Sequence, residues 1–404
     1  MKLPELLSPA GDRERLEAAL RFGANAVYLA APTFGMRSAP ENFAEEELEK
    51  AVRLAHECGA AVYVTCNILP RNPEIDRLPA YFEMVKAAGV DALIVADMGV
   101  MRLAGRLLPD MPLHVSTQFG IVNYETARML HEMGAKRVVL ARELSLAEIA
   151  DIRAKTDPAL ELECFVHGAM CMSYSGRCLL SNYLTGRDAN HGDCAQPCRW
   201  RYDVVEPGRP DLPLTVEQEE GGSYIFNAND LNMIEHLPAL TAAGVSSLKI
   251  EGRAKAAYYA AAVTNAYRTA LDGWRDSGFA ADYRPAAWIV EELEKVSHRP
   301  YGTGFYFGMP EQNLRAGGYI RTHQVAAVAE EWRDGVLTVS QRNRFFAGEM
   351  LQILEPGKPP FDLAVCELTD EEGQPIESAP HPTMRCRMAC PRSVQPGSLL
   401  RRET

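Results

Sequence analysis

Short apolar runs recur along the first 275 residues, and a glycine precedes most of them. The copies begin at Gly23, Gly59, Gly89, Gly134 and Gly244, and each run is aliphatic or β-branched, as in GVDALIVAD. A glycine can take the left-handed conformation that ends a helix, and a continuous apolar run is typical of a strand buried on both faces. Amphipathic stretches such as EEELEKAVRLAHECGA lie between the runs and predict helices. Alternating strands and helices indicate an α/β protein with a parallel sheet.

Three further strand candidates bring the count to eight: ELLSPAG near the start, LHVSTQ at 113–118 and LELECFVHG at 160–168. Eight strands with helices between them, over about 250 residues plus an insertion, predict a TIM-like (β/α)8 barrel at residues 1–278. An open Rossmann-like sheet is the alternative, but no GxGxxG opens the first helix after a strand. Residues 319–404 alternate apolar and polar positions between turns and predict a small antiparallel β-barrel, which residues 279–318 connect to the large domain.

Polar residues stand at nearly every predicted strand end, where active sites of such barrels gather. They are Ser8, Asp12, Arg37, Asn67, Asp97, Ser116, Gln118, Arg142, Glu143, His167, Lys249, Glu251 and Arg253. Taken singly, each also has a structural explanation, because Asp12 could cap a helix and Glu251 could pair with Arg253 on the surface. As a set they predict a catalytic face.

Four cysteines lie within 28 residues, namely Cys171, Cys178, Cys194 and Cys198. They belong to an insertion at about 168–229, between the seventh and eighth strands, which places them on the catalytic face. Their irregular spacing favours an iron–sulfur cluster over structural zinc, which usually uses two CxxC-type pairs. Unliganded buried thiols are the third option. Four other cysteines, Cys58, Cys66, Cys164 and Cys366, are predicted to be small core residues, and Cys386 and Cys390 are predicted to be structural.

The formal net charge of -12 argues against a sequence-blind polyanion binder, but it leaves room for local basic sites. Arg342 and Arg344 in SQRNRFF form one such pair, either as an RNA contact or as a solvated surface. The start of the chain carries no apolar run typical of a signal peptide, and no stretch reaches the roughly 18 apolar residues of a membrane span. We therefore expect a cytoplasmic protein with no membrane contact, in which ten cysteines indicate thiols and a metal site rather than disulfides.

Several longer segments resemble the U32 family, historically named as peptidases or collagenases. They are LLSPAGDRERLEAALRFGANAVYLA, HGAMCMSYSGRCLLSNY, GDCAQPCRWRY, FNANDL, SLKIEGRAKAAYY and SHRPYGTGFYFG. The likeness implies a 4Fe-4S cluster on Cys171, Cys178, Cys194 and Cys198. It also implies a hydroxylase, because better understood members form 5-hydroxyuridine at the tRNA wobble position, hydroxylate a cytidine of 23S rRNA, or act on quinone precursors. The chain is most similar to the tRNA branch, since it keeps HGAMC and CRWRY and lacks the long C-terminal extension of the rRNA type.

The resemblance implies a tRNA uridine hydroxylase that binds the anticodon region. His167, Arg142 and Glu143 are then candidates for proton transfer and for holding an anionic hydroxyl donor such as prephenate, with Lys249 and Glu251 beside them. Trp200 and Tyr202 could stack on a flipped base or anchor the loop. The sequence is compatible with a homo-oligomer.

Two other functions stay open. A peptidase would need a nucleophile with a base, or a hydrolytic metal, and the sequence has neither HExxH nor GxSxG. Ser116 lies two residues from His114 on one strand, without an evident third partner. A subunit that only carries the cluster for electron transfer or scaffolding is the other option.

Overall fold

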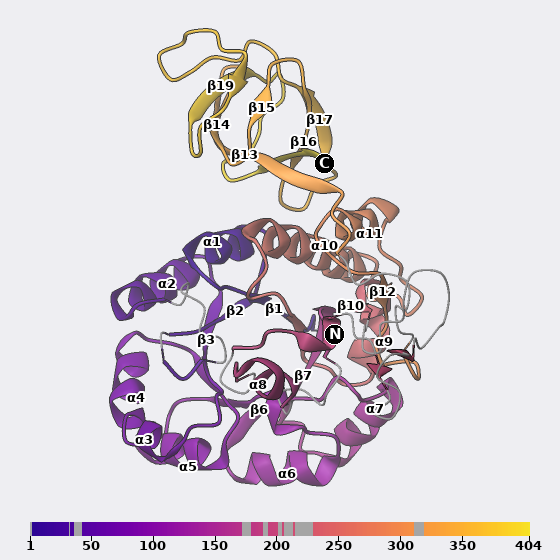
Figure 1. Ribbon diagram of the computed structural model, residues 1–404. Helices are drawn as coiled ribbons and strands as arrows, with labels where there is room; N and C mark the ends of the chain where they lie inside the picture. The colour runs from indigo at the N-terminus through magenta and orange to yellow at the C-terminus, as the bar shows by residue number, and fades with distance from the viewer. Residues whose placement is uncertain are drawn as a thin grey trace.

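Eight parallel strands close into a barrel ringed by helices, and a smaller all-β domain lies beside it (Figure 1). The computed structural model describes residues 2–31, 33–35, 43–171, 179–188, 193–200, 204–205, 213–214, 229–310 and 319–404. No helix in these ranges combines the length and the apolar character that a membrane crossing demands.

The barrel follows the predicted order of strands and helices. Its strands are β1 (Glu5–Pro9), β2 (Ala26–Leu29), β3 (Ala61–Cys66), β4 (Ala92–Val95), β5 (Leu113–Val115), β6 (Ala135–Val139), β7 (Glu161–Gly168) and β11 (Ser247–Ile250). The helices around them are α1 (Arg13–Arg21), α2 (Glu45–Glu57), α3 (Asn72–Ile75), α4 (Leu78–Ala87), α5 (Met98–Leu107), α6 (Tyr124–Glu132), α7 (Leu146–Lys155), α9 (Leu237–Ala242) and α10 (Ala257–Asp276). β11 pairs in parallel with both β7 and β1, which closes the sheet. The (β/α)8 prediction is confirmed, and an open Rossmann-like sheet is excluded.

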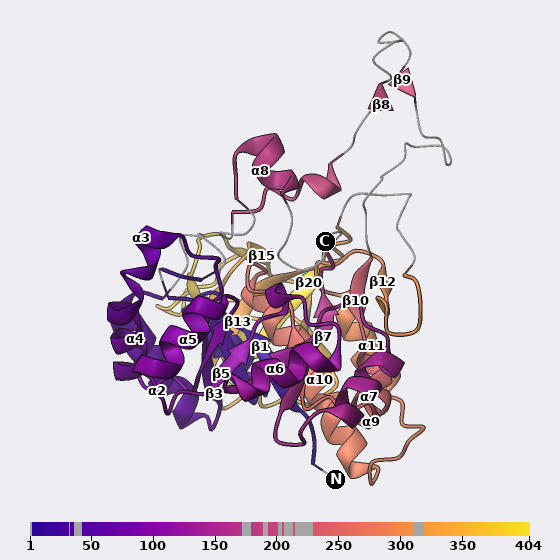
Figure 2. The ribbon, with the colours of Figure 1, turned by 90° about the horizontal axis from the view of Figure 1, so that it is seen from below.

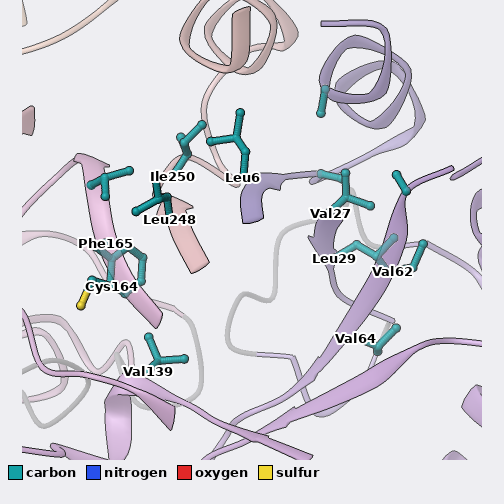
Figure 3. Packing of buried hydrophobic residues seen from close by; sticks show 14 of the residues in the cluster. Leu6, Val27, Leu29, Val62, Val64, Val139, Cys164, Phe165, Leu248 and Ile250 are labelled. Atoms are coloured by element: carbon teal, nitrogen blue, oxygen red, sulfur yellow. The ribbon is translucent and has the colours of Figure 1, made fainter. Parts of the chain in front are cut away.

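The local signals that predicted these elements operate as expected. The five repeat glycines all have positive φ, between 74° and 101°, and each lies between a helix end and the next strand. In α2, Leu48, Val52 and Ala55 form the buried face. Figure 3 shows strand residues such as Val64 and Leu248 within the apolar cluster that the helices cover. Two of the polar strand-end residues cap helices. The carboxylates of Asp12 and Asp97 accept hydrogen bonds from backbone N–H groups in the first turns of α1 and α5.

The insertion after β7 lies above the barrel, on the side opposite the N-terminus (Figure 2). It contains α8 (Leu180–Thr185), a 3₁₀ turn (Pro197–Arg199), β8 (Val204–Val205) and β9 (Pro213–Leu214). The chain then returns as β10 (Asp230–Asn232), which pairs antiparallel with the end of β7. The connecting segment 279–318 has elements of its own, because α11 (Ala287–Glu294) packs on α10 and β12 (Tyr301–Gly302) pairs with β10.

The C-terminal domain has a separate apolar core. Its strands are β13 (His323–Arg333), β14 (Val336–Gln341), β15 (Phe345–Phe346), β16 (Met350–Leu354), β17 (Phe361–Ala364), β18 (Ser378–Ala379), β19 (Arg385–Ala389) and β20 (Leu399–Glu403). Six of them form one antiparallel sheet in the order β17-β16-β20-β13-β14-β19, while β15 and β18 pair separately. Hydrogen bonds between Thr369, just after β17, and Arg387 in β19 join the two edges of the sheet. The predicted small antiparallel barrel is confirmed.

Two predictions about core cysteines are wrong. Cys66 and Cys164 are buried as expected, but Cys58 and Cys366 are exposed. Cys58 is the C-cap residue of α2 and lies at the surface there. In the small domain the side chains alternate as in a strand, so Val365 is buried and Cys366 is exposed. Cys386 and Cys390 are buried in the small domain, as predicted for structural thiols.

Candidate functional site at the barrel mouth

Three of the predicted catalytic residues lie on segments that reach the mouth of the barrel. Arg142 and Glu143 follow β6, and Glu251 follows β11. Arg142 Nη1 donates a hydrogen bond to the Ala169 carbonyl at 2.7 Å, and its guanidinium lies 4.9 Å from the centre of the Phe165 ring. The same guanidinium also hydrogen-bonds to Cys171, the first cysteine of the insertion. Arg142 therefore joins the end of β6 to the start of the cysteine segment.

The charges around Arg142 stabilise its positive form. Burial by itself lowers the pKa of Arg142, but Cys171, Glu251 and Glu143 outweigh it, so the pKa is raised. Burial raises the pKa of Glu143 and outweighs the backbone N–H groups of residues 142 and 143 and the charge of Arg142, which lower it. Glu143 Oε2 is buried and has no hydrogen-bond partner among the described residues. A fixed cation beside a carboxyl group whose pKa is raised can bind an anion and move a proton.

The end of β7 is held by a series of side chains that the sequence did not single out. Tyr306 Oη donates to the Phe165 carbonyl at 2.6 Å, and Tyr267 Oη donates to the Val166 carbonyl at 2.7 Å. The backbone N–H of Glu251 donates to the His167 carbonyl at 2.8 Å. Together with Arg142 on Ala169, these bonds fix the strand that leads into Cys171. Tyr306 lies in the SHRPYGTGFYFG segment, which was the only sequence signal for it.

His167 lies apart from this group. The backbone register shifts between Lys249 and Ile250, which pairs His167 with Ile250, a residue of the outer core. The imidazole is 1% exposed and contacts the rings of Tyr259, Tyr267 and Tyr301, with Nε2 3.3 Å from the Tyr301 hydroxyl. Burial lowers the pKa of His167 to about 3. The side chain is therefore neutral near pH 7 and enclosed between β7 and α10.

Lys249 points into the barrel rather than to its mouth. Its Nζ donates to Glu163 at 2.8 Å and lies 4.6 Å from the centre of the Tyr28 ring and 5.4 Å from that of Phe165. Arg137 binds the other oxygen of Glu163 at 3.0 Å. Lys249 is thus part of a buried ion network, and Phe165 lies against both Lys249 and Arg142.

The cysteine segment is described only in part. Cys171 and Cys194 are exposed and Cys198 is partly exposed, whereas Cys178 lies outside the described residues. The buried Ser181 of α8 accepts a hydrogen bond from the Ala195 N–H, and the Gln196 N–H points to Cys194 Sγ at 3.3 Å. Such N–H···S contacts are typical around cluster ligands. Within the described ranges no three Cys, His, Asp or Glu side chains are placed to hold a metal ion.

Other predicted contacts have mixed outcomes. Trp200 is 44% exposed beside the cysteines, while Tyr202 and Arg37 lie outside the described residues. Ser116 Oγ accepts from the Gln118 N–H at 3.4 Å, and the His114 ring packs edge-on against Tyr63 inside the barrel. His114 Nδ1 has no hydrogen-bond partner in the part of the chain that the structure covers. Ser116 and His114 are therefore not arranged there as a nucleophile and its base.

The family models cover nearly the whole chain. One, described as peptidase family U32, matches residues 11–316, and another, described as the peptidase family U32 C-terminal domain, matches residues 321–401.

Similar proteins with curated names include two that are named for tRNA hydroxylation. The tRNA hydroxylation protein P1 of Bacillus subtilis is 35% identical over 99% of this chain and 95% of its own length. The tRNA hydroxylation protein P of Escherichia coli is 36% identical over 92% of this chain and 91% of its own length. A 23S rRNA 5-hydroxycytidine synthase of Escherichia coli is 38% identical, but the match covers 75% of this chain and only 45% of that protein.

Proposed function

The chain belongs to peptidase family U32, and from this premise we propose that it is a tRNA-modifying enzyme that hydroxylates C5 of the wobble uridine. The observation that carries the proposal is likeness over nearly the full length of two proteins named for tRNA hydroxylation, against less than half the length of the rRNA enzyme. An unpaired anticodon base can move into a barrel mouth at a small cost in free energy, because no base pair has to be broken. A tRNA substrate also implies a cytoplasmic location.

Cys171, Cys178, Cys194 and Cys198 are the proposed ligands of a 4Fe-4S cluster. Three observations support a cluster at this place: Cys171 and Cys194 are exposed on the mouth side, Gln196 donates an N–H to Cys194, and Arg142 contacts Cys171. A bound cluster would supply one-electron redox chemistry.

Arg142 is the proposed anchor for an anionic hydroxyl donor of the prephenate type, because a guanidinium binds carboxylates in a bidentate manner. Glu143, with its raised pKa, is the proposed proton carrier, and Glu251 orients Arg142 through its charge. Loss of CO2 and hydroxide from prephenate takes up no electrons. Replacing a C–H bond by C–OH with that hydroxide releases one proton and two electrons from the base, so the proposed reaction includes a soluble redox carrier of the flavin or iron–sulfur class as the electron acceptor.

Nucleoside analysis of tRNA tests the proposal. A strain that lacks the gene should lose 5-hydroxyuridine and nucleosides derived from it, and a plasmid copy of the wild-type gene should restore them. A Cys171→Ala copy should fail, whereas Cys366→Ser, which changes an exposed cysteine of the small domain, should restore them fully. Unchanged hydroxyuridine in the deletion strain would overturn the function.

Two measurements test the cofactor and the donor separately. Anaerobically purified protein should contain about four iron atoms per chain if the cluster is of the 4Fe-4S type, and Cys171→Ala should lower that content. Prephenate labelled with oxygen-18 in its hydroxyl group should transfer the label to the nucleoside. Unlabelled product would remove prephenate from the proposal and leave the tRNA substrate standing.

A further inference from the structure

We infer that Arg344 and Phe346 of the C-terminal domain form a docking surface for the RNA substrate, away from the barrel mouth. We call this pair the Arg–Phe platform. The inference rests on the proposed function, which supplies the RNA, and adds a second place where that RNA is bound.

The platform pairs a cation with an exposed aromatic ring. The Arg344 guanidinium lies 4.7 Å from the centre of the Phe346 ring, and Phe346 is 39% exposed. Phe346 belongs to the short strand β15, which pairs with β18 outside the main sheet of the domain, and Arg344 directly precedes that strand. The guanidinium lies over one face of the ring and presents its own outer plane, on which an unpaired base can stack while its N–H groups meet a phosphate.

The backbone of the platform is fixed in advance. The N–H of Arg342 donates to the Ala326 carbonyl at 2.7 Å, and the Asn343 side chain donates to the Val325 carbonyl at 2.7 Å. Arg402 donates to the Arg344 carbonyl at 2.8 Å and is itself held by Glu349. Binding would therefore require little ordering of the loop, which favours affinity.

Most arginines of the same domain are paired with a carboxylate, and Arg344 differs from them in this respect. Arg342 pairs with Glu14 on α1, and Arg385 pairs with Glu330. No carboxylate among the described residues lies within ion-pair distance of Arg344, whose polar contact is the Ser378 hydroxyl at 3.4 Å. Of the basic pair noted in the sequence, Arg342 therefore ties the two domains together, and Arg344 has its charge available for a polyanion.

The platform has a fixed position relative to the mouth. Arg401 in β20 is 0% exposed and binds Glu292 of α11 at 2.5 Å and Gln352 at 2.6 Å. Lys295 also donates to Gln352, at 3.1 Å. Figure 2 places β15 toward the same side of the molecule as the insertion, and Figure 1 places it in the part of the small domain that points away from the barrel. The platform therefore lies toward the mouth side but outside the barrel, so an RNA bound at both places must extend beyond the base held at the mouth.

RNA fits this surface better than an acidic protein segment does. An acidic peptide would use the guanidinium but would gain little from the ring face, while every nucleobase has a face that stacks on an aromatic side chain. The two occupants therefore differ in how much binding depends on Phe346.

The experiment measures the affinity of the full-length protein for unmodified tRNA and for an anticodon stem-loop oligonucleotide, at two salt concentrations. The variants are Arg344→Ala, Phe346→Ala and the control Arg392→Ala. Arg392 also lies over an aromatic ring, that of Phe361 at 4.2 Å, but its charge is met by Glu355. Unfolding midpoints verify that each variant is folded.

We expect each platform variant to weaken tRNA binding about tenfold and Arg344→Ala to reduce the salt dependence by about one phosphate contact. Stem-loop binding and the Arg392→Ala variant should stay within about twofold of the wild-type value. Equal tRNA affinity in wild type and both platform variants would overturn the inference. So would an effect of Arg344→Ala alone combined with full competition by polyglutamate, since that pattern indicates an acidic partner.

Failure of the proposed function would look different. If the wild-type protein binds no tRNA and its deletion leaves hydroxyuridine unchanged, the proposed function falls and the platform loses its ligand. If the wild type binds and modifies tRNA while the platform variants bind it equally well, only the docking surface falls.

Discussion

The two ends of the barrel use the same residue types in opposite ways. At the N-terminal end of the strands, Arg137 binds Glu5 at 2.6 Å and Glu163 at 3.0 Å inside the closed barrel. At the C-terminal end, Arg142 lies among Glu251, Glu143 and Cys171, next to the insertion. Both arginines are buried, but the partners of the first are all strand residues, whereas the partners of the second include an exposed cysteine.

The difference teaches where a charge supports the fold and where it supports chemistry. The network at the N-terminal end forms a closed set in which each buried charge has an opposite partner, so its loss should reduce stability. The charges at the mouth meet a segment proposed to hold a cofactor, so their loss should reduce activity. Phe165, between Lys249 and Arg142, separates the two ends.

The largest effect is expected for Glu163→Gln. The change leaves Arg137 and Lys249 buried without their shared carboxylate, which should lower the free energy of unfolding by about 3–5 kcal/mol. Urea denaturation measures this loss, and the surface change Glu49→Gln is the control. A fully stable but inactive Glu163→Gln protein would break the comparison, because the network would then take part in chemistry.

Arg142→Lys should reduce activity much more than stability. It keeps the positive charge but loses the planar guanidinium, and we expect hydroxyuridine formation to fall about 100-fold. Stability should change much less than in Glu163→Gln. The exposed Arg102→Lys on α5 is the matched control. A variant with full activity would show that Arg142 only supports the strand ends.

Tyr306→Phe sharpens the comparison at the end of β7. It removes the hydrogen bond to the Phe165 carbonyl and should cost about 1–2 kcal/mol of unfolding free energy. The exposed Tyr183→Phe should cost nothing measurable. If Tyr306→Phe instead abolished activity at unchanged stability, the hydroxyl would have a role in the reaction itself.

The smallest effect is a pH dependence from His114 at the interior. Burial lowers the pKa of His114 to about 3, so the unfolded chain binds a proton near its ordinary pKa of 6.5 while the folded chain does not. The unfolded state then holds more protons below pH 6.5, and stability falls as the pH falls toward 3. Between pH 6.5 and 5.5 the His114→Gln variant should lose about 1 kcal/mol less than the wild type. Urea denaturation at the two pH values measures this difference, and an unaltered slope in His114→Gln would contradict the buried neutral state.

Periodicity was sufficient to predict the eight strands, their order and the small barrel, because buried strands and amphipathic helices leave repeating signals. The positions of Arg142, Glu143 and Glu251 followed from the rule that strand ends converge. The directions of Lys249 and His167 did not follow, since a residue at a strand end can face the interior, the mouth or the helix layer. The register shift beside Lys249 is a feature of paired strands and leaves no local sequence signal.

The tyrosines that hold β7 were missed for a related reason. Tyr267 and Tyr306 are 101 and 141 residues away from their carbonyl partners. A single apolar-aromatic residue at that separation resembles any core residue, and only the folded chain brings its hydroxyl to the strand end.

The closure of the sheet has a consequence for synthesis on the ribosome. β11 is the neighbour of both β1 and β7, and the insertion delays it. At the usual elongation rate, the roughly 80 residues between β7 and β11 keep a gap with two unpaired edges open for about 4 to 16 s. Nascent chains in that interval expose strand edges of the kind that aggregate. The barrel can therefore close only after β11 has left the ribosome, well after its two neighbours.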